Sequence, residues 1–82
     1  MMDEKQIEAI LEAQRQESIE VGKAFQIGDK LLRRFNGVTY EIVSSPEPGW
    51  FTLRALSKTR GVRIGEESTC NSVAVARYYE KI

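Results

Sequence analysis

The sequence predicts a small, mostly β (α+β) domain: an antiparallel barrel or meander preceded by an N-terminal α-helix. From Phe25 to Leu56 apolar and polar residues alternate, which is typical of strands that bury one face. Asn36-Gly37 and the loop from Ser45 to Gly49 interrupt this alternation with turn-forming residues. A chain of 82 residues has room for one modest core and little for a deep active-site cavity.

The composition changes near Gly22, where we place a boundary. Residues 1–24 are predicted to form an acidic helix with its linker, and residues 25–82 a small β-barrel domain. The first part carries six acids and three bases, whereas the second carries nine bases and six acids. This basic excess is too small to predict nucleic-acid binding unless the bases cluster on one surface.

Residues 4 to 17 are predicted to be helical, because Asp3 followed by Gln6 is a capping-box pattern and nothing up to Gln16 breaks a helix. The apolar stripe of this helix is thin and consists mainly of Ile7, Ile10 and Leu11. A ridge of like charges accompanies it at Glu4, Glu8 and Glu12. Two roles remain open: a solvated helix lying across the barrel, or an arm that docks on another subunit or partner.

The segment after this helix is predicted to change from helix to strand around Gly22. Its alternating apolar residues are Ile19, Val21, Phe25 and Ile27. Gly28-Asp29 then forms a turn signal before the first hairpin.

Residues 30–35 and 38–44 are predicted to be the two arms of a hairpin. Asn36-Gly37 suits a two-residue type I′ turn, which needs positive φ at both positions. The pairs expected on the core face are Phe35 with Val38, Arg33 with Tyr40, and Leu31 with Ile42. Arg33 is the one charged residue on this face, so we expect its stem to pack beside Tyr40 and its guanidinium to reach water.

The next predicted strand runs from Trp50 to Leu56. The purely apolar row of this strand, Phe51, Leu53 and Ala55, is the better core candidate. Trp50 and Arg54 are then left on the outer face, unless Trp50 caps the open end of the barrel. Residues 61–64 predict a short further strand, and residues 66–72 an irregular polar segment.

Residues 72–82 can be read as helix or as strand. Ser72 can cap a helical turn, whereas the aromatic residues and Ile82 favour a strand. We therefore predict a short helical turn before a closing strand. Tyr78 and Tyr79 cannot both face inward on one strand, so one is expected to pack and the other to be exposed.

The predicted elements resemble an SH3-like barrel of the KOW or Tudor type. The resemblance covers residues 25 to 82 and rests on Ile27-Gly28-Asp29, Phe35-Asn36-Gly37-Val38, Trp50-Phe51-Thr52-Leu53 and Arg77-Tyr78-Tyr79. It implies a binding function, because barrels of this group bind proline-rich peptides, methylated side chains, RNA or protein surfaces. Short chains of this kind also occur in phages and mobile elements.

Several classes of function have no support in the sequence. Cys70 is the only cysteine and histidine is absent, so the chain offers no intramolecular disulfide, no zinc ligand set and no histidine base for a thiolate. Glu66 and Glu67 point to opposite sides of an extended chain. The acidic N-terminus differs from a secretory signal, and no apolar run approaches roughly 18 residues. We expect a cytoplasmic, non-enzymatic protein with no catalytic residue, cofactor, metal or membrane segment.

The favoured function is protein–protein interaction through exposed aromatic residues and the N-terminal helix. The residues predicted to bind the partner are Trp50, Tyr78, Tyr79, Arg54 and Arg63. The alternative is recognition of an anionic ligand, namely RNA, DNA or a nucleotide-like molecule. Its predicted residues are Arg33, Arg34, Arg54, Arg60 and Arg63. The partner is not identified by the sequence, which also leaves a homodimer open.

Overall fold

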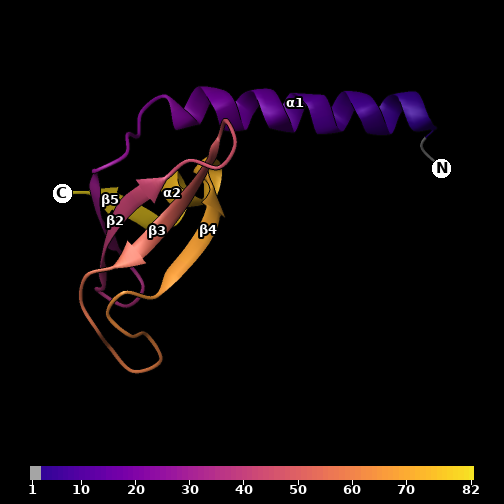
Figure 1. Ribbon diagram of the computed structural model, residues 1–82. Coiled ribbons are helices and arrows are strands. Elements are labelled where there is room, and N and C mark those ends of the chain that lie inside the picture. Colours follow the sequence, from indigo (N-terminus) through magenta and orange to yellow (C-terminus); the bar gives the residue numbers. More distant parts are fainter. Residues whose placement is uncertain (1–2) are drawn as a thin grey trace.

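Five antiparallel strands form one open sheet in the order β4-β3-β2-β1-β5, with a long helix at one end (Figure 1). The computed structural model describes residues 3–82. Its elements are α1 (Glu4–Gly22), β1 (Lys30–Arg33), β2 (Thr39–Ser44), β3 (Trp50–Ala55), β4 (Glu67–Asn71), α2 (Ser72–Tyr78) and β5 (Tyr79–Lys81). The α+β class and the meander from β1 to β3 are confirmed. Within the described residues β4 and β5 are the two edges and do not pair, so the sheet is not closed into a barrel.

Helix α1 begins as predicted and ends later. The Asp3 carboxylate accepts a hydrogen bond from the Gln6 amide, and the Gln6 side chain accepts one from the Asp3 amide, which completes the capping box. The helix continues to Gly22, so the predicted change to strand at Ile19 and Val21 is wrong. Apolar alternation over so few residues is a weak signal, and the helical backbone instead brings the small residues Ser18 and Gly22 against the β2–β3 loop and the start of α2.

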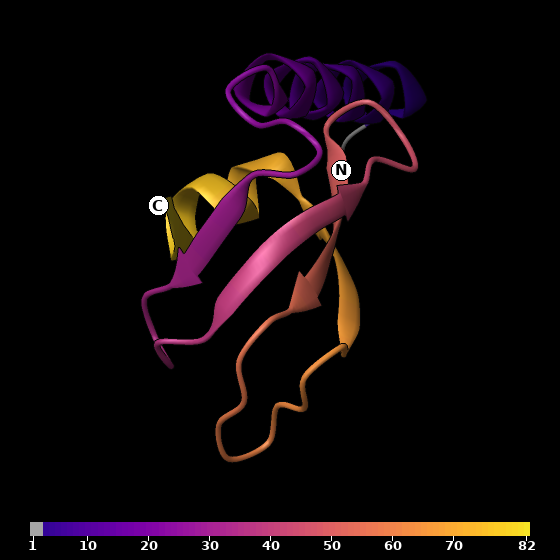
Figure 2. The same ribbon diagram turned by 60° about the vertical axis from the view of Figure 1, so that its left-hand side comes forward.

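The contact between α1 and the rest of the fold is short. Residues 4–17, which we call the arm, are all exposed, whereas Ser18 and Gly22 are buried. A Cβ atom on Gly22 would lie 3.3 Å from the Cα of Gly49, and one on Gly49 would lie 2.8 Å from the carbonyl carbon of Ser18. The helix therefore crosses the body, residues 18–82, at a point of close backbone approach and projects beyond it (Figure 2).

The linker after α1 is fixed by the end of the chain. The Lys81 ammonium lies 3.1 Å from the Asp29 carboxylate and donates a hydrogen bond to the Ala24 carbonyl. It also lies 5.7 Å from the centre of the Phe25 ring. The hydrogen bond from the Gln26 amide, and then the Lys81 charge, lower the pKa of Asp29.

The β1–β2 hairpin differs from the prediction in its turn and its register. Leu31 pairs with Tyr40 rather than with Ile42, because residues 34–37 form a longer turn. Gly37 is the turn residue with positive φ, whereas Asn36 has negative φ and accepts a hydrogen bond from the Val38 amide. The prediction of a type I′ turn is therefore wrong, because that turn requires positive φ at Asn36 as well as at Gly37.

A register shift of two residues keeps each side chain on its predicted face. The buried residues of this hairpin are Leu31, Val38, Tyr40 and Ile42, as predicted. Phe35, by contrast, was expected in the core and is 90% exposed at the turn. The longer turn carries Phe35 beyond the end of the ladder, where no second strand lies opposite it.

The second half of the sheet confirms one prediction and corrects two. The inward row of β3 is buried, as predicted, and consists of Phe51, Leu53 and Ala55. Residues 61–64 do not form a strand; only a Thr59–Val62 bridge interrupts the loop between β3 and β4. The fourth strand, β4, lies in the segment predicted to be irregular. It is an edge strand with largely exposed side chains, so its sequence lacks the apolar alternation of a half-buried strand.

The C-terminal prediction of a helical turn before a closing strand is confirmed. Asn71, rather than Ser72, caps α2, because its side chain accepts a hydrogen bond from the Val73 amide. Tyr79 is 6% exposed and Tyr78 is 52% exposed, so one tyrosine packs and the other faces solvent. The core of the fold consists of Leu31, Val38, Tyr40, Ile42, Phe51, Leu53, Ala55, Val75 and Tyr79.

Neither helix of the described chain has the length and apolar character needed to cross a bilayer.

Candidate functional site

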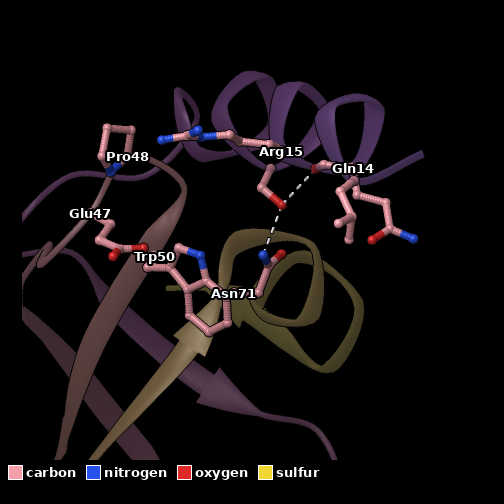
Figure 3. A pocket seen from close by; sticks show the side chains of 8 residues that line it. Gln14, Arg15, Glu47, Pro48, Trp50 and Asn71 are labelled. Carbon is pink, nitrogen blue, oxygen red and sulfur yellow. Dashed lines mark hydrogen bonds between the residues drawn. The ribbon is translucent and has the colours of Figure 1, made fainter. Parts of the chain in front are cut away.

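A groove lies where α1 passes over the β2–β3 loop and the junction of β4 with α2 (Figure 3). Its volume is about 390 Å³. We call it the Trp50 groove; its lining residues are Leu11, Gln14, Arg15, Ser18, Glu47, Pro48, Trp50 and Asn71. Apolar side chains, side chains of positive and of negative charge, and amide groups thus meet in one concave surface.

Hydrogen bonds through Ser18 fix the inner wall of the groove. Its hydroxyl donates to the Gln14 carbonyl over 3.0 Å and accepts from the Asn71 amide group over 2.7 Å (Figure 3). The buried Ser72 hydroxyl donates to the Ser18 carbonyl. Asn71 also caps α2, so a single residue links α1, β4 and α2. The helix is therefore held in place over the groove by satisfied polar groups.

Trp50 separates the groove from a second hollow. The side chain is 38% exposed and lies beneath α1, between Glu47 and Asn71 (Figure 3). The second hollow, of about 370 Å³, is lined by Pro46, Glu47, Trp50 and Thr69. A tryptophan that is part buried and part accessible combines a large apolar area with a polar N–H, which is typical of interface anchors.

The arm continues the groove beyond the body. Ile7, Ile10 and Leu11 are 46%, 45% and 59% exposed. Ile7, Leu11 and Ser18 are at helical spacing, so Ile7 and Leu11 lie on the same side of α1 as Ser18, which contacts the body. The apolar stripe therefore leads from solvent directly into the Trp50 groove.

The structure brings only Trp50, of the residues predicted to bind a partner, into this groove. Tyr78 lies at the far end of α2, and Arg63 is exposed in the loop between β3 and β4. The Arg54 guanidinium donates two hydrogen bonds to the Glu67 carboxylate, at 2.9 and 2.7 Å. Arg54 is thus already paired across the β3–β4 ladder.

Tyr79 belongs to the core and is not an accessible anchor. Its ring packs edge-on against Tyr40, with 5.5 Å between the centroids. Burial, and next the neighbouring Cys70 thiol, raise the pKa of Tyr79 to about 12. The phenol is therefore neutral at neutral pH.

The arginines predicted to bind an anion do not converge on one point. The Arg33 guanidinium lies 5.9 Å from the centre of the Tyr79 ring and lines one hollow with Tyr40, and its Nε atom is buried without a hydrogen-bond partner among the described residues. The hollow beside Arg33 also contains Glu66 and Glu67. The others are dispersed: Arg34 at the β1–β2 turn, Arg54 on β3, and Arg60 and Arg63 in the β3–β4 loop.

Sequence reasoning did not find the α1 side of the groove. Leu11 was predicted only as part of a thin stripe, and no role was predicted for Gln14 or Ser18. The missed signal is the pair Ser18 and Gly22, four residues apart on one face, since two small residues at this spacing permit close approach of a second backbone. Their partner, Gly49, was assigned only to a turn.

No family model, curated protein or solved structure matches this chain. Residues 3–82 contain no group of three or more histidine, cysteine or acidic side chains placed to hold a metal ion.

Proposed function

We propose that this chain is a non-enzymatic binding module that holds a segment of a partner protein in the Trp50 groove and along the arm. The observation that carries the proposal is the exposed stripe of the arm, which leads into a groove containing a partly exposed tryptophan. An isolated helix of this length is marginally stable in water. A partner segment that covers the apolar stripe of the arm would add the tertiary packing that the body does not provide.

The resemblance to SH3-like barrels supports a binding role for the sheet without choosing a ligand. The chemistry of the groove is more specific. Leu11, Pro48 and Trp50 offer apolar contacts, while Arg15 and Glu47 offer charges of opposite sign at its rim. An extended or helical peptide with an apolar anchor flanked by polar residues suits such a surface. A reducing cytoplasm, in which Cys70 stays a thiol, is the setting that we propose.

The test is affinity capture from the native cell, followed by nuclease treatment, with the wild-type chain and matched variants. Trp50→Ala is expected to cost at least about 2 kcal/mol of binding if the indole is the anchor. Ile64→Ala removes an exposed apolar residue in the loop between β3 and β4, outside the groove, and serves as the control. Partner capture that survives nuclease, is lost in Trp50→Ala and is kept in Ile64→Ala supports the groove. Equal capture by a folded Trp50→Ala variant contradicts it.

Recognition of an anionic ligand remains the alternative. Its support is the pair of exposed bases Arg60 and Arg63 in the loop between β3 and β4. Contacts with phosphates release counterions, so affinity for RNA or DNA would fall steeply as salt is raised. Titration of a fluorescent oligonucleotide at low and high salt tests this function, and the absence of binding at low salt rejects it.

A further inference from the structure

The end of the body away from the arm carries a second exposed surface. We call it the tip, and it consists of Arg34, Phe35, Arg77 and Tyr78. Phe35 is 90% exposed and Tyr78 is 52% exposed. Exposed aromatic rings beside arginines are a composition enriched at the energetic centres of protein interfaces.

Backbone contacts hold the parts of the tip together. The Arg34 amide donates a hydrogen bond to the Tyr78 carbonyl over 3.0 Å, and the Arg34 guanidinium donates one to the Arg77 carbonyl over 3.4 Å. Glu80 is the acid beside it, with 4.0 Å between its carboxylate and Arg34. The β1–β2 turn and the end of α2 therefore present a fixed surface with an excess of positive charge.

The arm has the opposite charge and a similar apolar content. Residues 4–17 contain four acids and two bases, which flank the exposed stripe of Ile7, Ile10 and Leu11. A basic aromatic surface and an acidic apolar helix are complementary in both respects, because each supplies the charge and the apolar area that the other lacks.

The two surfaces of one molecule cannot meet. The arm leaves the body in the direction away from the β1–β2 turn, which lies on the other side of the body from the free end of α1 in both views (Figures 1 and 2). The molecule is elongated, with a longest extent of 45 Å. Close contact of Ser18 and Gly22 with Gly49 fixes the direction of the helix, so bending it back would break the packing of the body.

We propose that the arm of one copy docks on the tip of a second copy, and that the exchange is reciprocal. Two elongated molecules placed antiparallel allow each arm to reach the other's tip, which gives a closed dimer with two equal contacts. Each contact places the stripe of the arm against Phe35 and Tyr78, and its glutamates near Arg34 and Arg77. The inference rests on the proposed function in taking the arm as a contact element, and it assigns the apolar stripe of the arm to a second copy of this chain.

The experiment uses charge reversal and recombination. The arm variant carries Glu8→Lys and Glu12→Lys, and the tip variant carries Arg34→Glu and Arg77→Glu. Each variant alone opposes like charges and is expected to weaken self-association at least about tenfold. An equimolar mixture of the two restores opposite charges at both contacts and is expected to form a mixed dimer. Sedimentation velocity from micromolar to millimolar protein, at low and high salt, measures each case.

A control variant with Lys30→Glu and Lys58→Glu changes the net charge as much as the tip variant does but lies outside both surfaces. It is expected to associate like the wild type. Circular dichroism and thermal melting confirm that each variant is folded, since all the substituted residues are exposed. The inference is overturned if the wild type is monomeric at every concentration, or if mixing the two variants restores nothing.

These outcomes are separable from a failure of the proposed function. A monomeric wild type that still captures another protein through Trp50 rejects the dimer and leaves the groove intact. Self-association that is lost in Trp50→Ala but kept in the tip variant assigns the contact to the groove and also rejects the tip. Reciprocal dimerisation without any capture through Trp50 rejects the groove and supports the tip.

Discussion

The last turn of α1 and the arm belong to one continuous helix but lie in different surroundings. The last turn is held by small residues, because Ser18 and Gly22 allow the backbone of α1 to approach Gly49 and the hydroxyl of Ser72. The arm contains all the large apolar residues of the first three turns, and these remain in solvent. The position of the helix is therefore set by close backbone contact, and its apolar stripe is left for another surface.

The difference also separates stability from binding. Groups in the body are buried and paired, so their replacement should change the free energy of unfolding. Exposed side chains of the arm make few contacts in the monomer, so their replacement should affect association instead. The following variants test this division from the largest expected effect on unfolding to the smallest.

The largest effect is expected for Gly49→Ala. The new Cβ atom would lie 2.8 Å from the carbonyl carbon of Ser18, at a backbone φ of +83°. We expect a loss of at least about 3 kcal/mol in the free energy of unfolding, from steric overlap added to the cost of a left-handed conformation. Urea denaturation measures it.

Gly65→Ala is the matched control. Gly65 has a φ of +88°, but a Cβ atom there would meet nothing within 4 Å. The loss in the free energy of unfolding should be limited to the cost of the left-handed backbone conformation, about 1 to 2 kcal/mol. Equal losses for the two variants would show that the approach of α1 to Gly49 does not stabilise the body.

A smaller loss in the free energy of unfolding is expected at high pH, where Tyr79 loses its proton. Because burial raises the pKa of Tyr79 from 10.0 to about 12, the unfolded chain loses this proton before the folded chain does. The contribution is complete below pH 10 and falls as the pH rises toward 12, by about 2 to 3 kcal/mol in total. Denaturation of the wild type and Tyr79→Phe over this range should show the steeper loss in the wild type. Parallel curves would contradict the burial of a neutral phenol.

Ser72→Ala removes the hydroxyl that donates to the Ser18 carbonyl. Ser72 is fully buried, so the carbonyl loses a partner in a place that water does not reach, and we expect a cost of about 1 to 2 kcal/mol. Hydrogen exchange should show faster opening of the last turn of α1 than of β2. Unchanged protection of that turn would mean that Gly22 and Gly49 alone hold the helix.

Much of the body follows from residue patterns that the sequence displays directly. Alternation in β2 and β3 identified the buried rows, and the capping box identified the start of α1. The register of the first hairpin was not predictable, because Asn36-Gly37 suits a two-residue turn as well as it suits the longer turn of residues 34–37. β4 was missed since an edge strand has no need of an apolar row.

The candidate site was predicted less well than the fold. Trp50 was found because it lies in the outer row of an identifiable strand. Ser18, Asn71 and Gly49 acquire their roles only through contacts between segments far apart in the chain, and no local pattern contains that information. The exposure of Phe35 likewise depends on a turn whose length is decided by the surrounding sheet.

The smallest effect on unfolding is expected for Leu11→Ala in the arm. Leu11 is 59% exposed, whereas Leu53 is completely buried in the sheet, so the same substitution samples the two regions directly. We expect less than about 0.5 kcal/mol for Leu11→Ala and about 2 to 5 kcal/mol for Leu53→Ala. Denaturation of dilute, monomeric protein provides both values. A large loss for Leu11→Ala under these conditions would show that the arm contributes to folding of the monomer, and that its apolar stripe is not reserved for a partner.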